Sequence, residues 1–285
     1  MIIKRGIFLV MFLVIIFSLS FISSAESISN EKEVSFKYIL DGKEDVINFI
    51  VYKDVVDYLG DLSPSIISNG NETPSIIDFK LKHLDDEVQK SFLIPLVDKI
   101  RQKSNNPLEQ FRIAVSLVQN IEYGEKQEEV VLNSEQRTGY SRYPYEVLYD
   151  NQGICGEKSE LMVFLLKELG YSTGIFRYAE ENHEAVAVSC PKKNSIDNTG
   201  YCFVETTGPS IITDDSIVYV GDVKLESEPI VYELSGGKDL DNNLFEYRDA
   251  KTMKKLREGK FVFFRNWRLN RLNEKYGLVE EYNLE

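Results

Sequence analysis

The chain has 285 residues, of which 43% are apolar and 28% charged, an ordinary composition for a globular protein. Its formal net charge of −13 and its pI near 4.8 argue against nucleic-acid binding, because domains that bind DNA or RNA are usually basic. A chain of this length can form one large domain or two small ones, with an ample hydrophobic core.

The N-terminus has the features of a targeting segment. Lys4 and Arg5 precede an apolar stretch over residues 6–22, and small residues follow it up to Ala25. Residues 1–25 are therefore predicted to be a signal peptide or an uncleaved membrane anchor. Both alternatives export the rest of the chain, because the positive charges stay inside. We expect a secreted protein, or one anchored to the outer face of the cytoplasmic membrane, that contacts the membrane only through this segment.

An N-terminal β-hairpin region is predicted over residues 31–60. Two runs rich in β-branched and aromatic residues flank Asp41-Gly42, a dipeptide that favours a tight hairpin turn. The following residues, 61–80, are rich in Ser, Pro, Asn and Gly, and we expect them to form a loop.

Two helices are predicted after this loop. An acidic start and a basic end favour a helix over residues 84–103, which Pro95 is expected to kink or split. Asn106-Pro107 supplies a cap and a first-turn proline for a second helix that runs to about Ile121. The acidic, Gln-rich residues 124–138 are expected to form a surface loop.

The clearest helix covers residues 155–169, where apolar residues recur at helical spacing and Gly170 marks the end. Strands are predicted after it at about 173–178, 184–190 and 200–207, with a further pair near 216–232. Glycines at 236–237 mark the predicted boundary between a domain at 84–235 and a C-terminal extension at 238–285, which is basic over residues 248–275.

Three cysteines in an exported chain suggest one disulfide and one free thiol. Cys190 and Cys202 flank a polar loop and are the natural pair, although two small buried thiols remain the alternative. If His183 and Glu205 face each other across a regular hairpin, these cysteines fall several residues out of register. A bulge or a folded loop must then close the gap. Cys155 is free under either alternative.

The order of three residues points to cysteine-nucleophile acyl chemistry. Cys155 begins a predicted helix, His183 begins a predicted strand, and Glu205 lies on the next strand. A helix N-terminus and a nearby imidazolium both stabilise a thiolate, and the unpaired N–H groups of the first turn can bind an oxyanion. In this scheme His183 accepts and returns the proton, while Glu205 orients the ring.

Other residues around this motif have weaker signals. His83, the only other histidine, is expected to be a surface residue. Gln152 is a candidate oxyanion donor, with a solvated loop residue as the alternative. A tyrosine cluster before the cysteine could line a substrate groove or be ordinary packing; it comprises Tyr140, Tyr143, Tyr145 and Tyr149.

The motif resembles the transglutaminase-like superfamily, and within it the exported prokaryotic, often archaeal, branch. The likeness covers roughly residues 84–210 and is carried by five segments: SLVQNIEY at 116–123, YPYEVL at 143–148, NQGICGEKSELMVFLLKELGY at 151–171, ENHEAVAV at 181–188 and VETTGP at 204–209. This resemblance implies an α+β fold of the papain-like type, in which a Cys-bearing helix packs on an antiparallel sheet. By position it makes Cys155 the nucleophile, His183 the base and Glu205 the third member of a catalytic triad.

Three departures from the family pattern bear on the reaction. The family more often has Asp where this chain has Glu205, and members of this branch often carry acidic residues around the cysteine, where this chain has Ile154 and Gly156. No Trp stands near Cys155 or after His183. Hydrolysis or another amide exchange is therefore a better expectation than protein cross-linking. We expect a cysteine-dependent amide or isopeptide hydrolase or acyltransferase that forms a thioester with a peptide or protein substrate.

Two alternatives to this function stay open. One is a non-catalytic module that binds peptide or cell wall, and the other places the function in the basic C-terminal extension. Neither a cofactor nor a metal is expected, because two histidines and one free cysteine cannot form a common zinc site.

Overall fold

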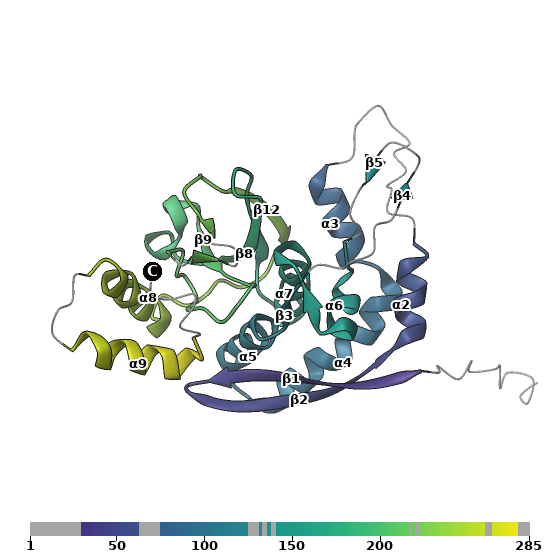
Figure 1. Ribbon diagram of the computed structural model, residues 1–285, viewed down its shortest axis with the longest axis horizontal. Helices are drawn as coiled ribbons and strands as arrows, with labels where there is room; N and C mark the ends of the chain where they lie inside the picture. The colour runs from purple at the N-terminus through teal and green to yellow at the C-terminus, as the bar shows by residue number, and fades with distance from the viewer. Residues whose placement is uncertain are drawn as a thin grey trace, which may run out of the picture.

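The computed structural model describes residues 30–62, 75–124, 131–132, 136–137, 141–216, 218–219, 223–259 and 264–278. Helices and sheets are mixed in it (Figure 1), and all strand pairs are antiparallel except one of two residues, as expected for an α+β protein. The predicted export segment, 1–25, and Tyr140 lie outside the described residues. No helix in the described part of the chain is long and apolar enough to cross a bilayer.

The predicted N-terminal hairpin is confirmed. Strands β1 (Glu31–Leu40) and β2 (Lys43–Tyr52) pair along their whole length around Asp41-Gly42. Gly42 has φ +75°, a conformation that glycine adopts without strain, and its N–H donates to the Lys275 carbonyl at 3.0 Å. A helix that was not predicted, α2 (Lys53–Gly60), completes the region 31–60.

One prediction about the next segment is wrong, and another is answered in part. Residues 76–80 are not loop but part of α3 (Ile76–Leu84), because Ser75 and Asp78 form a capping box in front of an apolar run. The rest of the predicted loop, apart from residues 61, 62 and 75, lies outside the described residues. Pro95 lies inside α4 (Glu87–Lys103) without splitting it, because buried leucines on both sides of it hold the helix in the core. The helix predicted after Asn106-Pro107 is confirmed as α5 (Pro107–Gln119).

The predicted cysteine helix is confirmed as α7 (Cys155–Glu168), and Gly170 follows it with φ +87°. It is preceded by α6 (Pro144–Asp150) and by the parallel pair β3 (Glu122–Tyr123) and β6 (Gln152–Gly153). The expected surface loop at 124–138 lies mostly outside the described residues, apart from the short antiparallel pair β4 (Val131–Leu132) and β5 (Gln136–Arg137).

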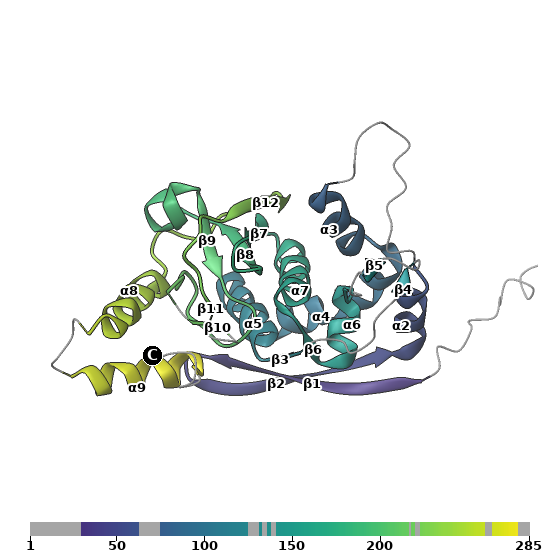
Figure 2. The ribbon, with the colours of Figure 1, turned by 45° about the horizontal axis from the view of Figure 1, so that its top comes forward.

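The main sheet has the strand order β12 (Ile230–Ser235), β7 (Thr173–Tyr178), β8 (His183–Ser189) and β9 (Tyr201–Val204). Figures 1 and 2 show α7 between this sheet and α6. Valines on β8 belong to the core shared with α7, and the alanines between them belong to a second apolar cluster with Phe203. The strand predicted at 200–207 ends at Val204, so Glu205 lies just beyond it.

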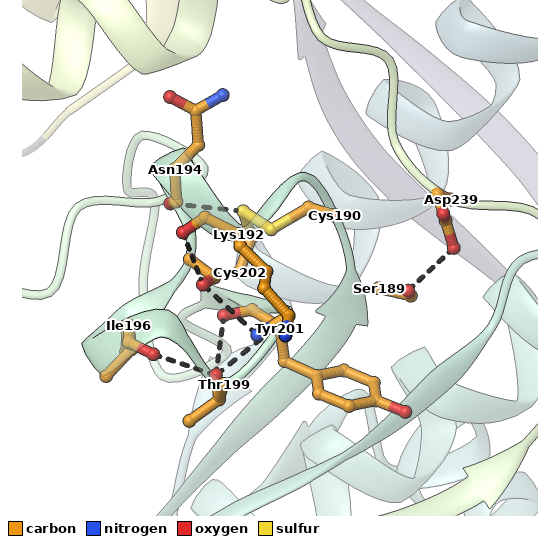
Figure 3. Close-up of a disulfide and its surroundings, with 11 residues drawn as sticks. Ser189, Cys190, Lys192, Asn194, Ile196, Thr199, Tyr201, Cys202 and Asp239 are labelled. Carbon is orange, nitrogen blue, oxygen red and sulfur yellow. Dashed lines mark hydrogen bonds between the residues drawn. A yellow bond between two sulfur atoms is a disulfide. The ribbon is translucent and has the colours of Figure 1, made fainter.

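The predicted disulfide between Cys190 and Cys202 is present, with a Cα–Cα distance of 5.8 Å (Figure 3). Strand pairing sets Cys202 opposite Val188. Cys190 therefore lies two residues further along the chain than the residue that is paired with Cys202. The loop between the cysteines folds into the short 3₁₀ turns η1 (Lys192–Asn194) and η2 (Ile196–Asn198). The folded loop thus closes the gap that the sequence required.

The remaining elements are the short pair β10 (Val218–Tyr219) and β11 (Val223–Lys224) and two C-terminal helices, α8 (Phe245–Arg257) and α9 (Arg265–Tyr276). The helices share an apolar cluster with Ile211. The buried pair Arg112–Glu246 joins α8 to α5 at 2.5 Å, and α9 reaches the turn of the N-terminal hairpin through Lys275.

Candidate active site

Cys155 is the first residue of α7 and is the chain's one free thiol, since the other two cysteines form the disulfide. Ile154 before it has an extended backbone, φ −84° and ψ 174°, so the chain turns into the helix at the sulfur-bearing residue. The side chain is partly exposed. The thiol therefore lies at the positive end of the helix dipole and within reach of solvent.

The carboxylate of Glu205 is completely buried and has four hydrogen-bond partners. Its Oε2 atom lies 3.0 Å from His183 Nε2. Its Oε1 atom accepts from the Thr206 N–H at 2.9 Å, and from the N–H and Oγ1 of Thr207, both at 2.7 Å. Burial alone would raise the pKa of Glu205, but His183 and the Thr207 donors lower it, so the carboxylate is ionised.

His183 lies between this carboxylate and the thiol. Its Nε2 is bound to Glu205, which leaves Nδ1 as the ring nitrogen that can serve Cys155. Burial lowers the pKa of His183, but the charge of Glu205 and the interactions of the ring with Cys155 and Glu205 outweigh it and raise the pKa to about 10. The ring is thus a cation at neutral pH, placed to stabilise a thiolate.

Hydroxyl and amide groups connect the segment that carries Glu205 to the helix that carries Cys155. Thr206 Oγ1 donates to the Cys155 carbonyl at 3.3 Å and lies 3.2 Å from Ser159 Oγ, one turn further along α7. On α5, Gln119 Nε2 donates to the Glu205 carbonyl at 3.0 Å and to the Ser210 carbonyl at 3.3 Å. These contacts fix the end of β9 against the start of the cysteine helix.

Sequence reasoning assigned no role to these supporting residues. Gln119 and Thr206 lie in the segments VQNIEY and VETTGP that carry the family resemblance. Their place in these two segments is the sequence signal from which a role for Gln119 and Thr206 could have been predicted.

Lys158, one turn after Cys155, is completely buried, which is unusual for lysine. Its Nζ donates to the carbonyls of Ile121 at 2.5 Å and of Thr207 at 3.3 Å. Burial lowers its pKa to about 7, against the opposing effect of the Glu205 charge. Lys158 therefore fastens the Glu205 segment to α7 with an amino group that is only partly protonated at neutral pH.

The expectation that His83 is a surface residue is wrong. Its ring is stacked on Tyr143 at 4.2 Å, and its Nδ1 lies 3.0 Å from Glu160 Oε2 on the cysteine helix. Only 15% of the side chain is exposed. The residue is brought there by α3, whose first residues, 76–80, were predicted to be loop.

Lys80, one turn before His83, completes a buried ionic cluster. Its Nζ lies 3.1 Å from Glu160 Oε1 and 2.7 Å from Glu184 Oε2, and each of the three side chains is at most 8% exposed. Glu184 follows His183 on β8, and a side chain at Gly156, the residue after Cys155, would have to push its carboxylate aside. The cluster therefore links α3, α7 and β8 directly beside the thiol.

Gln152 is not a solvated loop residue. Its amide lies against Gly124, where any side chain would collide with it, and its Oε1 accepts from Arg142 Nη2 at 3.3 Å. These contacts hold the amide against Gly124 and Arg142. They do not test the role of Gln152 as an oxyanion donor, which stays a prediction.

The tyrosines before the cysteine were expected to line a groove or to pack. Tyr143 and Tyr145 are buried, and Tyr145 Oη accepts from the Tyr52 N–H at 2.8 Å. Tyr149 is partly buried against the same core. For these three residues the structure favours packing.

Within the described ranges, no three His, Cys, Asp or Glu side chains are grouped as metal ligands. Comparisons with protein-family models, with curated proteins and with solved structures found no match for this chain.

Proposed function

We propose that this protein is a cysteine-dependent amide or isopeptide hydrolase or acyltransferase with a transglutaminase-like, papain-like core. The observation that supports the proposal is the arrangement of Cys155 at the start of α7, with His183 interacting with it and bound at 3.0 Å to the buried carboxylate of Glu205. A thiolate, an imidazolium and a buried carboxylate in this order are what nucleophilic acyl chemistry requires.

The proposed reaction has two stages. In the first, the Cys155 thiolate attacks a carboxamide or isopeptide carbonyl, and the free N–H groups at the start of α7 stabilise the oxyanion. His183 then donates its Nδ1 proton to the departing amine, which leaves a thioester. In the second stage His183 takes a proton from water or from another amine, which attacks the thioester and releases Cys155.

Hydrolysis is favoured over cross-linking by the position of the chain's single tryptophan. Trp267 is 60% exposed on α9 and contacts Arg271. No indole is therefore available from the segments around Cys155 and His183 to assist the transition state. An amine acceptor remains chemically possible, so the acyl acceptor is the first property to measure.

The test incubates the protein with a mixture of glutamine-containing and isopeptide-linked peptides, with and without a labelled primary amine. Mass spectrometry then identifies peptides that lose ammonia, lose the linked amine or gain the label. We expect products with the native protein and none with Cys155→Ala. If neither protein yields products while both bind the peptides equally, the site is a binding module and the enzymatic proposal is wrong.

A further inference from the structure

The C-terminal helical hairpin carries an unusual pair of exposed aromatic side chains. Phe264, just before α9, is 74% exposed, and Trp267, in the first turn, is 60% exposed. They are the two most exposed large hydrophobic side chains in the described part of the chain. Figures 1 and 2 show α8 and α9 together at one end of the molecule, beyond the main sheet.

The folding of the hairpin does not account for this pair. The inner face of α9 is already buried through Leu269 and Leu272, each 6% exposed, which pack with Met253 and Leu256 of α8. Trp267 and Arg271 are four residues apart and share one side of α9, and Phe264 is the residue directly before its first turn. The aromatic pair thus forms a separate outward-facing apolar feature.

The charge of the hairpin is opposite to that of the whole chain. Helices α8 and α9 contain nine Lys and Arg residues and three Asp and Glu residues, whereas the chain has a net charge of −13. Of the three acids, Glu246 is buried on Arg112 and Asp249 accepts from Lys275. Lys254 also pairs with Asp215, outside the two helices, at 3.7 Å. The exposed residues of the hairpin still carry an excess of positive charge, and the Arg271 guanidinium lies over the Trp267 ring, 5.8 Å from its centroid.

We propose that the α8–α9 hairpin docks on an anionic lipid surface. Phe264 and Trp267 enter the headgroup layer, where aromatic side chains are favoured, and the exposed basic side chains meet lipid phosphates. Exposed basic residues of the two helices are Arg248, Lys251, Lys254, Lys255 and Arg271.

Lipid fits these observations better than a protein partner. A stable protein interface buries about 800 Å² on each side around an apolar core, whereas here two protruding rings stand among charges. Docking adds a second membrane contact to the one expected from residues 1–25. It is independent of the proposed chemistry at Cys155.

Trp267 makes the proposal directly measurable, because it is the only tryptophan in the chain. The full-length protein is mixed with neutral phosphatidylcholine vesicles or with vesicles that contain phosphatidylglycerol, and tryptophan emission is recorded. We expect a blue shift, and quenching by brominated lipid, on the anionic vesicles alone. The N-terminal segment can bind both kinds of vesicle without moving Trp267 into lipid, so attachment through that segment does not produce the signal.

Matched variants separate the two contributions. Phe264→Ser should weaken the emission change, whereas Ile50→Ser, at a residue 45% exposed on β2, should not. Replacing Lys251 and Lys255 by Gln should weaken anionic binding about fivefold per lysine. The same replacements at Lys37 and Lys90, on β1 and α4, should leave it unchanged.

Two results would overturn the proposal. One is Trp267 emission that stays constant on anionic vesicles. The other is a shift of Trp267 emission that has the same size on neutral and anionic vesicles and does not change when Lys251 and Lys255 are replaced. A shift produced by a soluble acidic protein, with no response to lipid, would identify a protein partner instead.

Discussion

His183 and Glu205 interact on a diagonal across the β8–β9 hairpin, not as directly opposed residues. Strand pairing sets Val186 opposite Val204, and its continuation would set His183 opposite Thr207. The 3.0 Å contact between Nε2 and Oε2 forms because the Glu205 carboxylate reaches onward along the chain, where its other oxygen accepts from the N–H groups of Thr206 and Thr207. The longer side chain of glutamate, compared with aspartate, suits this diagonal.

Glu205→Gln should slow alkylation of Cys155 at neutral pH about tenfold or more. The substitution keeps the shape of the side chain but removes the charge that raises the pKa of His183 to about 10. Without that charge, burial lowers the pKa of His183, and a pKa about one unit below the pH leaves only about a tenth of the rings protonated, so the imidazolium that stabilises the thiolate becomes scarce. The measurement is the pH–rate profile for modification by iodoacetamide.

Glu205→Asp is the matched control, because it keeps the charge and shortens the side chain by one methylene. It should retain more reactivity than Glu205→Gln if charge matters more than reach. Labelling counts only Cys155, since Cys190 and Cys202 form the disulfide. Equal rates for native protein and Glu205→Gln between pH 6 and 8 would show that the carboxylate does not activate the thiol.

The free energy of unfolding should depend on pH through His183 and Lys158, whose effects are opposite in sign and nearly cancel. His183 has a pKa raised from 6.5 to about 10, so its contribution is complete below pH 6.5 and is lost as the pH rises to 10. Lys158 has a pKa lowered from 10.5 to about 7, so the unfolded chain binds the extra proton and stability rises over the range from 7 to 10.5.

Single substitutions should separate these two dependences. In Lys158→Met the free energy of unfolding should fall between pH 7.5 and 9.5, by up to about 1.4 kcal/mol per pH unit. In His183→Gln it should rise over the same range. Urea denaturation at several pH values measures both slopes, and parallel curves for the two variants would contradict the assignment.

Local sequence patterns predicted the elements that carry Cys155 and His183, because such patterns act over short distances. The helical spacing of apolar residues after Cys155 and the glycine at position 170 each set the backbone within a few residues. The cysteine pair likewise lies at the ends of one short loop. Such features need no knowledge of distant contacts.

The buried charges could not be predicted in the same way. His83 lies in a short helix behind a Ser- and Pro-rich stretch, and its contact with Glu160 spans 77 positions in sequence. Lys158 is a polar residue on an amphipathic helix, which by pattern alone belongs to the solvated face. Its burial depends on carbonyl acceptors from Ile121 and Thr207, in two other segments.

Lys80→Met should destabilise the protein strongly, by about 3–5 kcal/mol. The variant leaves the carboxylates of Glu160 and Glu184 buried without their shared cation, and an uncompensated buried charge is costly. Urea denaturation measures the loss. Adding Glu184→Gln should recover part of it, because one of the stranded charges is then removed.

The exposed pair of Lys90 and Glu87 provides the comparison for this prediction. Lys90→Met should change the free energy of unfolding by less than about 1 kcal/mol, since surface ion pairs contribute little. Equal losses of unfolding free energy for Lys80→Met and Lys90→Met would show that the buried cluster contributes no more to stability than an exposed ion pair.

Removing the disulfide should cost about 3 kcal/mol, mainly by freeing the unfolded chain, because the bridge closes a loop with a sequence separation of 12. The variant replaces Cys190 and Cys202 by Ala in a Cys155→Ser background, which prevents thiol exchange in both proteins. Urea denaturation of the two proteins gives the difference, and adding reductant should lower the stability of the Cys155→Ser protein alone.

Because β8 and β9 carry the partners of the thiol, the same double substitution with Cys155 retained should also slow its alkylation. A stable variant with native alkylation kinetics would show that strand pairing alone holds His183 and Glu205 in place.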